Sequence, residues 1–131
     1  MNRFLKGAVM GSAVLLLAAL LLQTAIVSAA LQRKKSLRAK HVDELFNRNC
    51  ARCHGADGRS DTPLGHVYKA PDFTDVEWWR KNASISNTRT LKSIVTRGKA
   101  GMPAFGKKLT RSEINLLVGH VRSFRKPVGP P

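Results

Sequence analysis

Apolar residues recur at helical spacing in three separate segments of the chain. These positions are Val42, Leu45 and Phe46 in the first segment, Leu91, Ile94 and Val95 in the second, and Ile114, Leu117, Val118 and Val121 in the third. Separations of three and four residues place side chains on one face of an α-helix. Gly98 follows the second segment as a C-terminal cap, and Thr110 with Glu113 forms a capping box before the third. The pattern therefore predicts three amphipathic helices, the first of which leads into Cys50.

A shorter fourth helix is predicted near the middle of the chain. Thr74 and Glu77 have the spacing of a capping box and stand before Trp78 and Trp79. Residues 55–73 are rich in Gly, Asp and Pro and predict a long loop. No segment shows the alternation that a strand requires. The predicted fold class is therefore all-α, with three to four short helices and long loops.

The chain begins with a long uncharged segment. Residues 7–32 carry no charged side chain and follow Arg3 and Lys6, an order that is typical of an export signal. Small residues at 28–30 would permit cleavage, whereas 26 uncharged residues are also enough to span a hydrocarbon core of ~30 Å. We therefore expect residues 1–32 to be an export signal or an N-terminal membrane anchor, with the uncleaved anchor favoured. The rest of the chain is expected outside the cytoplasm.

Basic residues dominate the charged positions. The chain has 23 Lys and Arg against 8 Asp and Glu, and residues 31–131 retain 21 of these basic residues and all 8 acidic ones. This excess favours an anionic partner, such as an acidic protein face or a membrane surface. The basic residues are scattered, so nucleic acid is not expected as a partner. We predict a basic linker at 33–37, a domain at 38–126 and a Pro/Gly tail at 127–131.

The two cysteines suggest how so small a domain is stabilised. Four short helices and a long loop bury little apolar surface, so a domain of this kind usually needs further stabilisation by a covalent cross-link or a bound metal. Cys50 and Cys53 form a C-x-x-C-H motif with His54, which is the attachment signature of c-type haem. Each thiol is expected to form a thioether with a vinyl group of the porphyrin, and His54 is expected to ligate the iron. The cofactor would then supply the missing core.

Three alternatives for this motif are less favoured. A dithiol redox pair would require a strand and helix of the thioredoxin type around the two cysteines. A structural zinc site would need a fourth ligand, and none is obvious. A structural disulfide across two intervening residues would constrain little of the chain.

The sixth iron ligand is predicted to be Met102. The other two methionines lie in the export segment, whereas Met102 stands in the sequence GKAGMPAFGKK between two predicted helices. Pro103 disfavours helix at Met102, and Gly101 and Gly106 allow tight turns on either side. One alternative is that Met102 fills a gap in the core. The others are ligation by His41, His66 or His120, none of which has a comparable setting.

In these features the chain resembles the class I cytochromes c, and in particular the bacterial single-haem domains that also occur in oxidase and dehydrogenase complexes. The motifs that carry the resemblance are F-x-x-x-C-x-x-C-H-G at 46–55, A-D-G at 56–58, Pro63, P-D-F-T-D-x-E-W-W at 71–79, G-M-P-A-F-G at 101–106 and L-T-x-x-E at 109–113. The resemblance covers about residues 38–125. It implies the small all-α cytochrome c fold around one covalently attached haem.

The resemblance also implies roles for individual residues. It assigns Cys50 and Cys53 as thioether sites, His54 and Met102 as axial ligands, Pro63 as the carbonyl that accepts the His54 ring N–H, and Trp78 or Trp79 as the indole beside the haem edge. One departure concerns the crossing of the first and last helices, where the family usually places a small residue against an aromatic one. Val42 and His120 stand at these positions here.

The predicted function is single-electron transfer. A Met/His ligand pair raises the reduction potential relative to nitrogen or thiolate ligation. Two axial ligands also leave no open position for a substrate, so a carrier is expected rather than an enzyme. The alternative is a haem-bearing electron-transfer subunit of a larger membrane oxidase or dehydrogenase, and a haem sensor or peroxidase is less favoured. The expected location is the periplasmic side of the bacterial cytoplasmic membrane, with redox partners that present an acidic docking face.

Overall fold

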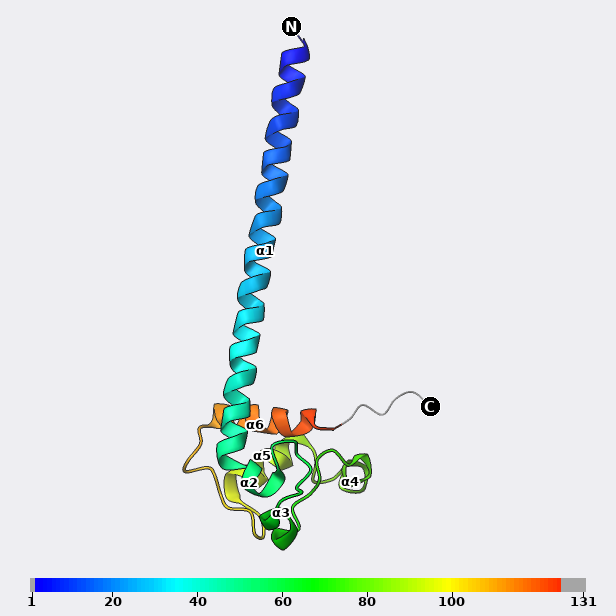
Figure 1. The fold of residues 1–131 in the computed structure, drawn as a ribbon, viewed down its shortest axis with the longest axis vertical. Coiled ribbons are helices and arrows are strands. Elements are labelled where there is room, and N and C mark those ends of the chain that lie inside the picture. The colour runs from blue at the N-terminus through cyan, green and yellow to red at the C-terminus, as the bar shows by residue number, and fades with distance from the viewer. Residues whose placement is uncertain (1, 126–131) are drawn as a thin grey trace. The chain divides into compact units, whose positions relative to one another are not determined.

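The structure is a computed structural model that describes the backbone of residues 2–125, and within this range the side chains of all residues except 2–22, 24 and 25. The chain divides into two compact units, Met1–Ala39 and Lys40–Pro131. The helices in chain order are α1 (Asn2–Asn49), α2 (Ala51–His54), α3 (Pro63–Tyr68), α4 (Val76–Lys81), α5 (Thr88–Arg97) and α6 (Arg111–Ser123), as Figure 1 shows. No strand occurs in the described part of the chain, so the all-α prediction is confirmed.

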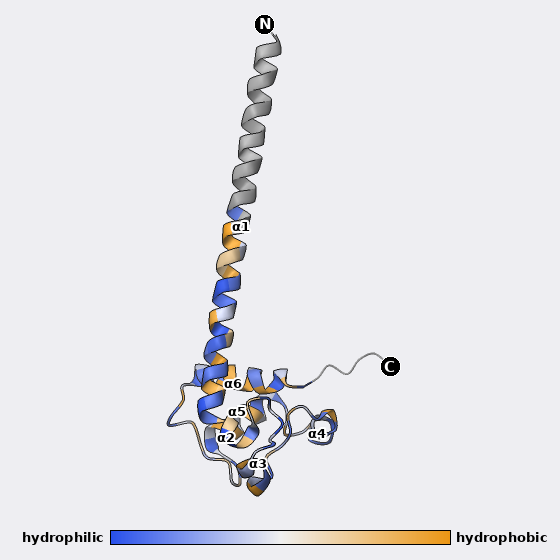
Figure 2. Cartoon of the chain, in the orientation of Figure 1, coloured by the Kyte–Doolittle hydropathy of each residue, from blue (hydrophilic) through white to orange (hydrophobic). Residues whose placement is uncertain are grey.

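Helix α1 is longer than the sequence pattern predicts. It runs from Asn2 to Asn49 without a break, so residues 33–37, which the sequence predicts as a basic linker, are helical. Their role as a linker stays a prediction. Lys, Arg and Leu favour helix, and neither Gly nor Pro occurs between Gly11 and Gly55 to interrupt it. The part of α1 that leads into the second unit is mostly hydrophilic (Figure 2).

The two terminal predictions fall mainly outside the described residues. Most side chains of the expected export signal or anchor at 1–32 are not described, and neither is the expected tail at 127–131. Among the residues that could be searched, no helix is both long enough and apolar enough to cross a membrane.

The core of the second unit forms where α6 crosses the C-terminal part of α1, and α5 packs against α6 (Figure 1). One cluster of buried side chains comprises Leu45, Phe46, Phe105, Leu109, Ile114 and Leu117, and we call it the crossing cluster. A second comprises Phe73, Trp79, Leu91 and Val118, and we call it the tryptophan cluster. Apolar faces predicted from the sequence therefore make the core, because burial of these side chains provides most of the driving force for folding.

The ends of α5 and α6 are capped as predicted. The Gly98 N–H donates to the Ile94 carbonyl at the end of α5. At the start of α6 the Thr110 hydroxyl accepts from the Glu113 N–H, and the Glu113 carboxylate accepts from the Thr110 N–H at 2.7 Å. Both ends satisfy backbone groups that a helix terminus leaves unpaired.

The start of α4 differs from the predicted capping box. The N-cap is Asp75 rather than Thr74, because the Asp75 carboxylate accepts from the Glu77 N–H at 2.8 Å. The Thr74 hydroxyl donates to Asp72 instead, at 2.7 Å. The fourth helix is therefore real, and only its capping residue was wrong.

Helix α3 lies within the segment that the sequence predicts as loop. The Thr62 hydroxyl accepts from the Gly65 N–H at 2.8 Å, and Pro63 occupies the first helical position. Proline fits there because its fixed φ suits the helix and its missing N–H would have no partner in any case. The prediction of a loop throughout 55–73 is therefore corrected, and the Thr-Pro pair is the signal that was missed.

His120 takes part in an aromatic contact at the helix crossing. Its ring lies 4.9 Å from those of both Phe46 and Phe124, and its Nδ1 lies 3.4 Å from the Asp43 carboxylate. Burial lowers the pKa of His120, and Asp43 acts in the opposite direction. Val42 packs against the same cluster. The crossing therefore retains an aromatic side chain in the form of a histidine ring.

Candidate functional site

The C-x-x-C-H motif folds into a single tight turn, which consists of α2 and its N-cap Cys50 and directly follows α1. The N–H groups of Cys53 and His54 both donate to the Cys50 carbonyl, at 3.1 and 3.0 Å. Both cysteines are free thiols, so the disulfide alternative is not formed. Burial is the main cause that raises the pKa of the Cys50 thiol to about 11. The turn therefore presents two thiols and an imidazole from four consecutive helical residues and their N-cap.

The His54 ring has a buried nitrogen with no partner. It is half-buried and stacks on Phe73, with the ring centroids 4.7 Å apart. Its Nδ1 is buried and makes no hydrogen bond within the described residues. Burial lowers the pKa of His54, while the Pro71 carbonyl acts in the opposite direction. A metal-binding histidine uses one ring nitrogen as the ligand and donates the N–H of the other to a carbonyl, and a half-buried imidazole beside the Pro71 carbonyl suits both roles.

The predicted contact between Pro63 and His54 is not formed in this structure. Pro63 is exposed at the start of α3, and the carbonyl that acts on the imidazole is that of Pro71. The role of Pro63 in the loaded protein stays a prediction.

Helix α3 is held directly against the cysteine turn. The Thr62 hydroxyl, besides capping α3, donates to the Cys53 carbonyl at 3.0 Å. Gly65 lies so close to this turn that an added Cβ would overlap the carbonyl oxygens of Cys53 and Ser60. Only a residue without a side chain permits this approach. Helix α3 therefore fixes one side of the turn that carries His54.

The same helix reaches the segment that carries Met102. The Tyr68 ring lies on Gly101, where an added Cβ would overlap it. Lys99 and Met102 exchange two backbone hydrogen bonds, at 3.0 and 3.1 Å, which closes a tight loop after α5. Met102 is half-buried and packs, like Cys50, against the crossing cluster. The fold thus brings the two predicted ligand segments against one cluster of side chains.

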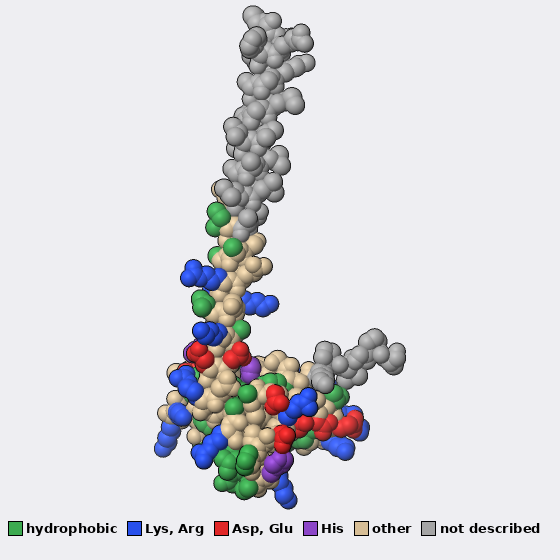
Figure 3. Space-filling model, viewed as in Figure 1, with side chains coloured by type: hydrophobic (Ala, Val, Ile, Leu, Met, Phe, Trp, Pro, Cys, Tyr) green, Lys and Arg blue, Asp and Glu red, His purple; other side chains and the backbone are tan. Residues whose placement is uncertain are grey.

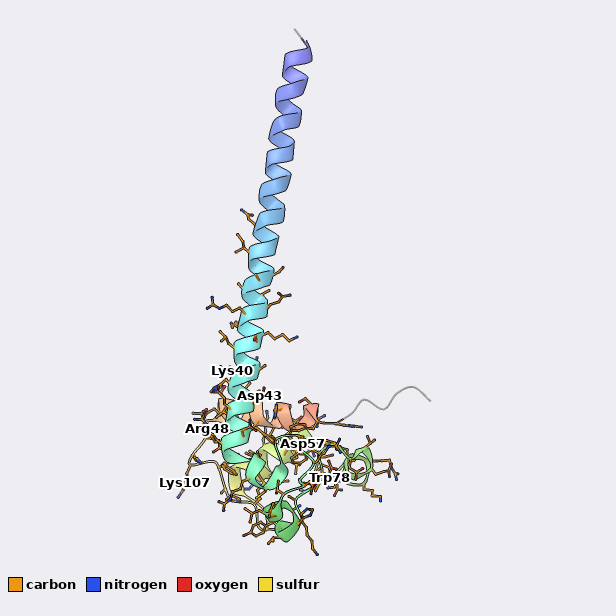
Figure 4. The ribbon with its side chains drawn as sticks, viewed as in Figure 1. Lys40, Asp43, Arg48, Asp57, Trp78 and Lys107 are labelled. Atoms are coloured by element: carbon orange, nitrogen blue, oxygen red, sulfur yellow. The ribbon has the colours of Figure 1, made fainter. Side chains whose placement is uncertain are left out.

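Only one of the two tryptophans is fully buried. Trp79 is 3% exposed, and its indole N–H donates to the Phe73 carbonyl at 2.7 Å. Trp78 is half-buried, with its ring 6.0 Å from that of Phe73. Figure 4 shows Trp78 on the α4 side of the unit, far from Lys107 in the loop that follows Met102. Which tryptophan approaches a haem edge stays a prediction.

Phe73 is a residue of the site that the sequence reasoning did not single out. It stacks on His54, and its N–H donates to the Gly58 carbonyl at 2.8 Å. Gly58 in turn lies against the Phe124 ring of the segment after α6. An aromatic residue between two aspartates in a polar loop was the available signal. The position of His54 therefore depends on packing that begins at the end of α6.

Substitution of Gly58 tests this packing. An added Cβ would lie 2.7 Å from the Phe124 ring, and the φ of +76° is unfavourable for a side chain. Gly58→Ala should therefore destabilise the holoprotein by about 1–3 kcal/mol, which lowers the thermal midpoint by roughly 4–8 °C per kcal/mol. Gly119→Ala is the matched control, because its Cβ meets nothing within 4 Å and alanine favours helix. Equal midpoints for the two variants would contradict the assigned packing.

The three histidines weighed as alternatives to Met102 have other surroundings. His66 lies at the surface with its Nε2 3.0 Å from Asp61, and His41 is exposed. His120 belongs to the aromatic contact described above. Among the described residues, no group of three or more His, Cys, Asp or Glu side chains could hold a metal ion. Two thiols, an imidazole with an unpaired nitrogen and a thioether fit a c-type haem.

Comparison with known proteins agrees with this fit. Residues 38–121 match the family model described as "Cytochrome C oxidase, cbb3-type, subunit III". The cbb3-type cytochrome c oxidase subunit FixP of Azorhizobium caulinodans is 33% identical over 87 residues, which are 66% of this chain and 27% of that protein. The chain thus spans less than a third of the length of the oxidase subunits that it matches.

Two further proteins are similar over most of their own length. Cytochrome c6 of Diacronema lutheri is 30% identical over 81 residues, which are 62% of this chain and 89% of that protein. The solved structure of the KustC0563 c-type cytochrome is 34% identical, with a TM-score of 0.56 over 64% of this chain and 96% of that one. Since the family model covers more than half of the chain, this protein belongs to the c-type cytochrome family described as "Cytochrome C oxidase, cbb3-type, subunit III".

Proposed function

We propose that this protein transfers single electrons, with Cys50 and Cys53 holding a c-type haem and His54 and Met102 as its axial ligands. Family membership implies the covalently bound cofactor. The observation that carries the proposal is that Cys50, Cys53 and His54 form one turn, and that Cys50 of this turn packs on the same cluster as Met102. When bound, the haem supplies an iron that takes up and releases one electron.

The chain's own residues suit a carrier. The neutral thioether of Met102 favours the reduced state, and His54 and Cys50 are both half-buried. With His54 and Met102 both bound, no position remains for a substrate. Hydrophobic side chains gather over α3 (Figure 3), where Val67 is 70% and Tyr68 54% exposed beside the Met102 loop. This apolar surface supports electron exchange with a partner near that loop.

A role within a larger complex is the second candidate. The relatives from Azorhizobium caulinodans and Azospirillum brasilense are subunits of cbb3-type oxidases, and this chain matches about a quarter of each. An electron-transfer subunit would use the same four residues. Purification of the native protein in mild detergent distinguishes the two roles, because a subunit co-migrates with a catalytic partner and a carrier does not.

We place the second unit on the periplasmic side of the cytoplasmic membrane, with residues 1–32 as signal or anchor. The motivation is the uncharged segment at 7–32, preceded by Arg3 and Lys6. A carbonate wash of membranes followed by N-terminal sequencing tests it. A soluble protein that starts near residue 31 is a cleaved product, and one that stays in the membrane from residue 1 is anchored.

Electron exchange with small redox reagents of opposite charge tests both the carrier role and an acidic partner. Residues 31–131 carry 21 basic and 8 acidic side chains, and Figure 3 shows basic ones spread over the visible face. The reduced holoprotein should pass one electron per haem to anionic ferricyanide, at a rate that falls severalfold between about 20 and about 300 mM salt. With a cationic cobalt complex the rate should rise instead. If the transfer rate depended on salt in the same way for both reagents, the expected attraction of acidic partners would be contradicted. If no electron reached either reagent, the carrier role itself would be contradicted.

A further inference from the structure

A cavity of about 430 Å³ lies where α4, the loop after it and the end of α6 meet. Three arginines line it, Arg80, Arg122 and Arg125. None of Cys50, Cys53, His54 or Met102 does. Its volume is in the range of small-molecule sites. Trp79, whose indole N–H donates to the Phe73 carbonyl, also lines the cavity. The three guanidinium groups in one cavity call for an explanation of their own.

Two of the guanidinium groups are held in place by neighbours. Arg122 donates to the Ser86 carbonyl at 2.9 Å and so links α6 to the loop before α5. Arg80 donates to the Glu77 carboxylate through its Nε at 3.1 Å and its Nη2 at 2.7 Å. Arg125 has no acidic partner among the described residues. One carboxylate therefore offsets one of the three charges, and the charges of Arg122 and Arg125 remain uncompensated.

Ser86 adds a further polar group to the cavity wall. The residue is 7% exposed and lines the cavity, and its hydroxyl can both donate and accept a hydrogen bond. Arg122 still has unused N–H donors beside the Ser86 carbonyl that it binds. Ser86, Arg122 and Arg125 thus offer several donors and few acceptors.

Part of the wall is apolar. Val76, Trp79 and Ala83 contribute this part. Guanidinium groups bind phosphate in a bidentate manner, and two uncompensated charges match a dianion better than a single carboxylate. We propose that this cavity is a binding site for a phosphate ester, with the phosphate on Arg122, Arg125 and Ser86 and the apolar part against Val76 and Ala83. The proposal does not depend on the electron-transfer function.

Calorimetric titration of the full-length holoprotein in detergent tests the site, with phenyl phosphate as the probe. Phenyl phosphate should bind at one site and more tightly than inorganic phosphate, because its ring contacts the apolar wall. Arg125→Gln should weaken this binding roughly tenfold, since a charge-assisted hydrogen bond is lost. Arg125 is exposed, so this variant should unfold at the same temperature as the parent. Arg111→Gln, the same charge change at the other end of α6, should leave the affinity within about twofold.

These outcomes distinguish a specific phosphate-ester site from non-specific attraction of anions to a basic protein. Equal weakening by Arg125→Gln and Arg111→Gln, or no heat with phenyl phosphate, overturns the proposal. Two competitors then identify the source of the phosphate. Stronger competition by dihexanoyl phosphatidic acid than by glycerol 3-phosphate supports a lipid headgroup, and the reverse order supports a soluble ester.

Discussion

Met102→Leu should lower the reduction potential of the holoprotein by at least about 60 mV, which is a tenfold change in a one-electron equilibrium. Leucine has nearly the volume of methionine, so the contact with the crossing cluster is kept while the thioether is lost. A soft, neutral sulfur stabilises ferrous over ferric iron, and its removal also opens the sixth position. Carbon monoxide should therefore bind the reduced variant but not the parent. The weak ferric absorption band near the red edge of the visible spectrum should disappear.

His66→Ala is the matched control for Met102→Leu. His66 lies at the surface against Asp61, so the potential, the red-edge band and the exclusion of carbon monoxide should all be unchanged. If Met102→Leu kept a closed site while His66→Ala opened it, the axial assignment would be wrong. The carrier role would then have to be reconsidered, because it depends on two bound ligands.

The double variant Cys50→Ala, Cys53→Ala should lose covalent haem. After denaturing electrophoresis the parent should retain haem peroxidase staining in the gel, and the variant should show none, because the two thiols are the only cysteines in the chain. The variant should also fold poorly, since the second unit without haem has only two small clusters of buried side chains among its described residues.

Arg52→Ala is the control for the cysteine variant. Arg52 lies between the cysteines and is exposed, so its removal should preserve both the stain and the fold. A stained double variant would be incompatible with thioether attachment and therefore with a c-type haem. Loss of the stain in Arg52→Ala as well would point to a general failure of maturation instead.

Much of this protein follows from short-range sequence alone. The cysteine turn forms among five consecutive residues, and α5 and α6 carry both their apolar faces and their caps within their own segments. Helix spacing and capping act over three or four residues, so a local pattern suffices to predict them. For the same reason the attachment motif and the Met102 segment are recognisable from the order of residues alone.

Which residue caps a helix, where two neighbouring residues could do so, was decided only by the structure. Thr74 and Asp75 were both able to begin α4, and the hydrogen bond from Thr74 to Asp72 left Asp75 as the cap. Helix α3 depends on the same kind of choice, because Thr62 caps it while also binding the Cys53 carbonyl. Neither preference can be read from spacing, since each side chain had more than one available partner.

Contacts between distant segments were decided only by the tertiary structure. The stacking of His54 on Phe73, the choice of Trp79 for the core and the packing of Gly58 on Phe124 all join segments that are separated in the chain. The cavity at Arg122 and Ser86 joins residues 36 positions apart. Such contacts form when close packing of the whole core fixes which side chains meet, and that packing depends on the shapes of all the elements together.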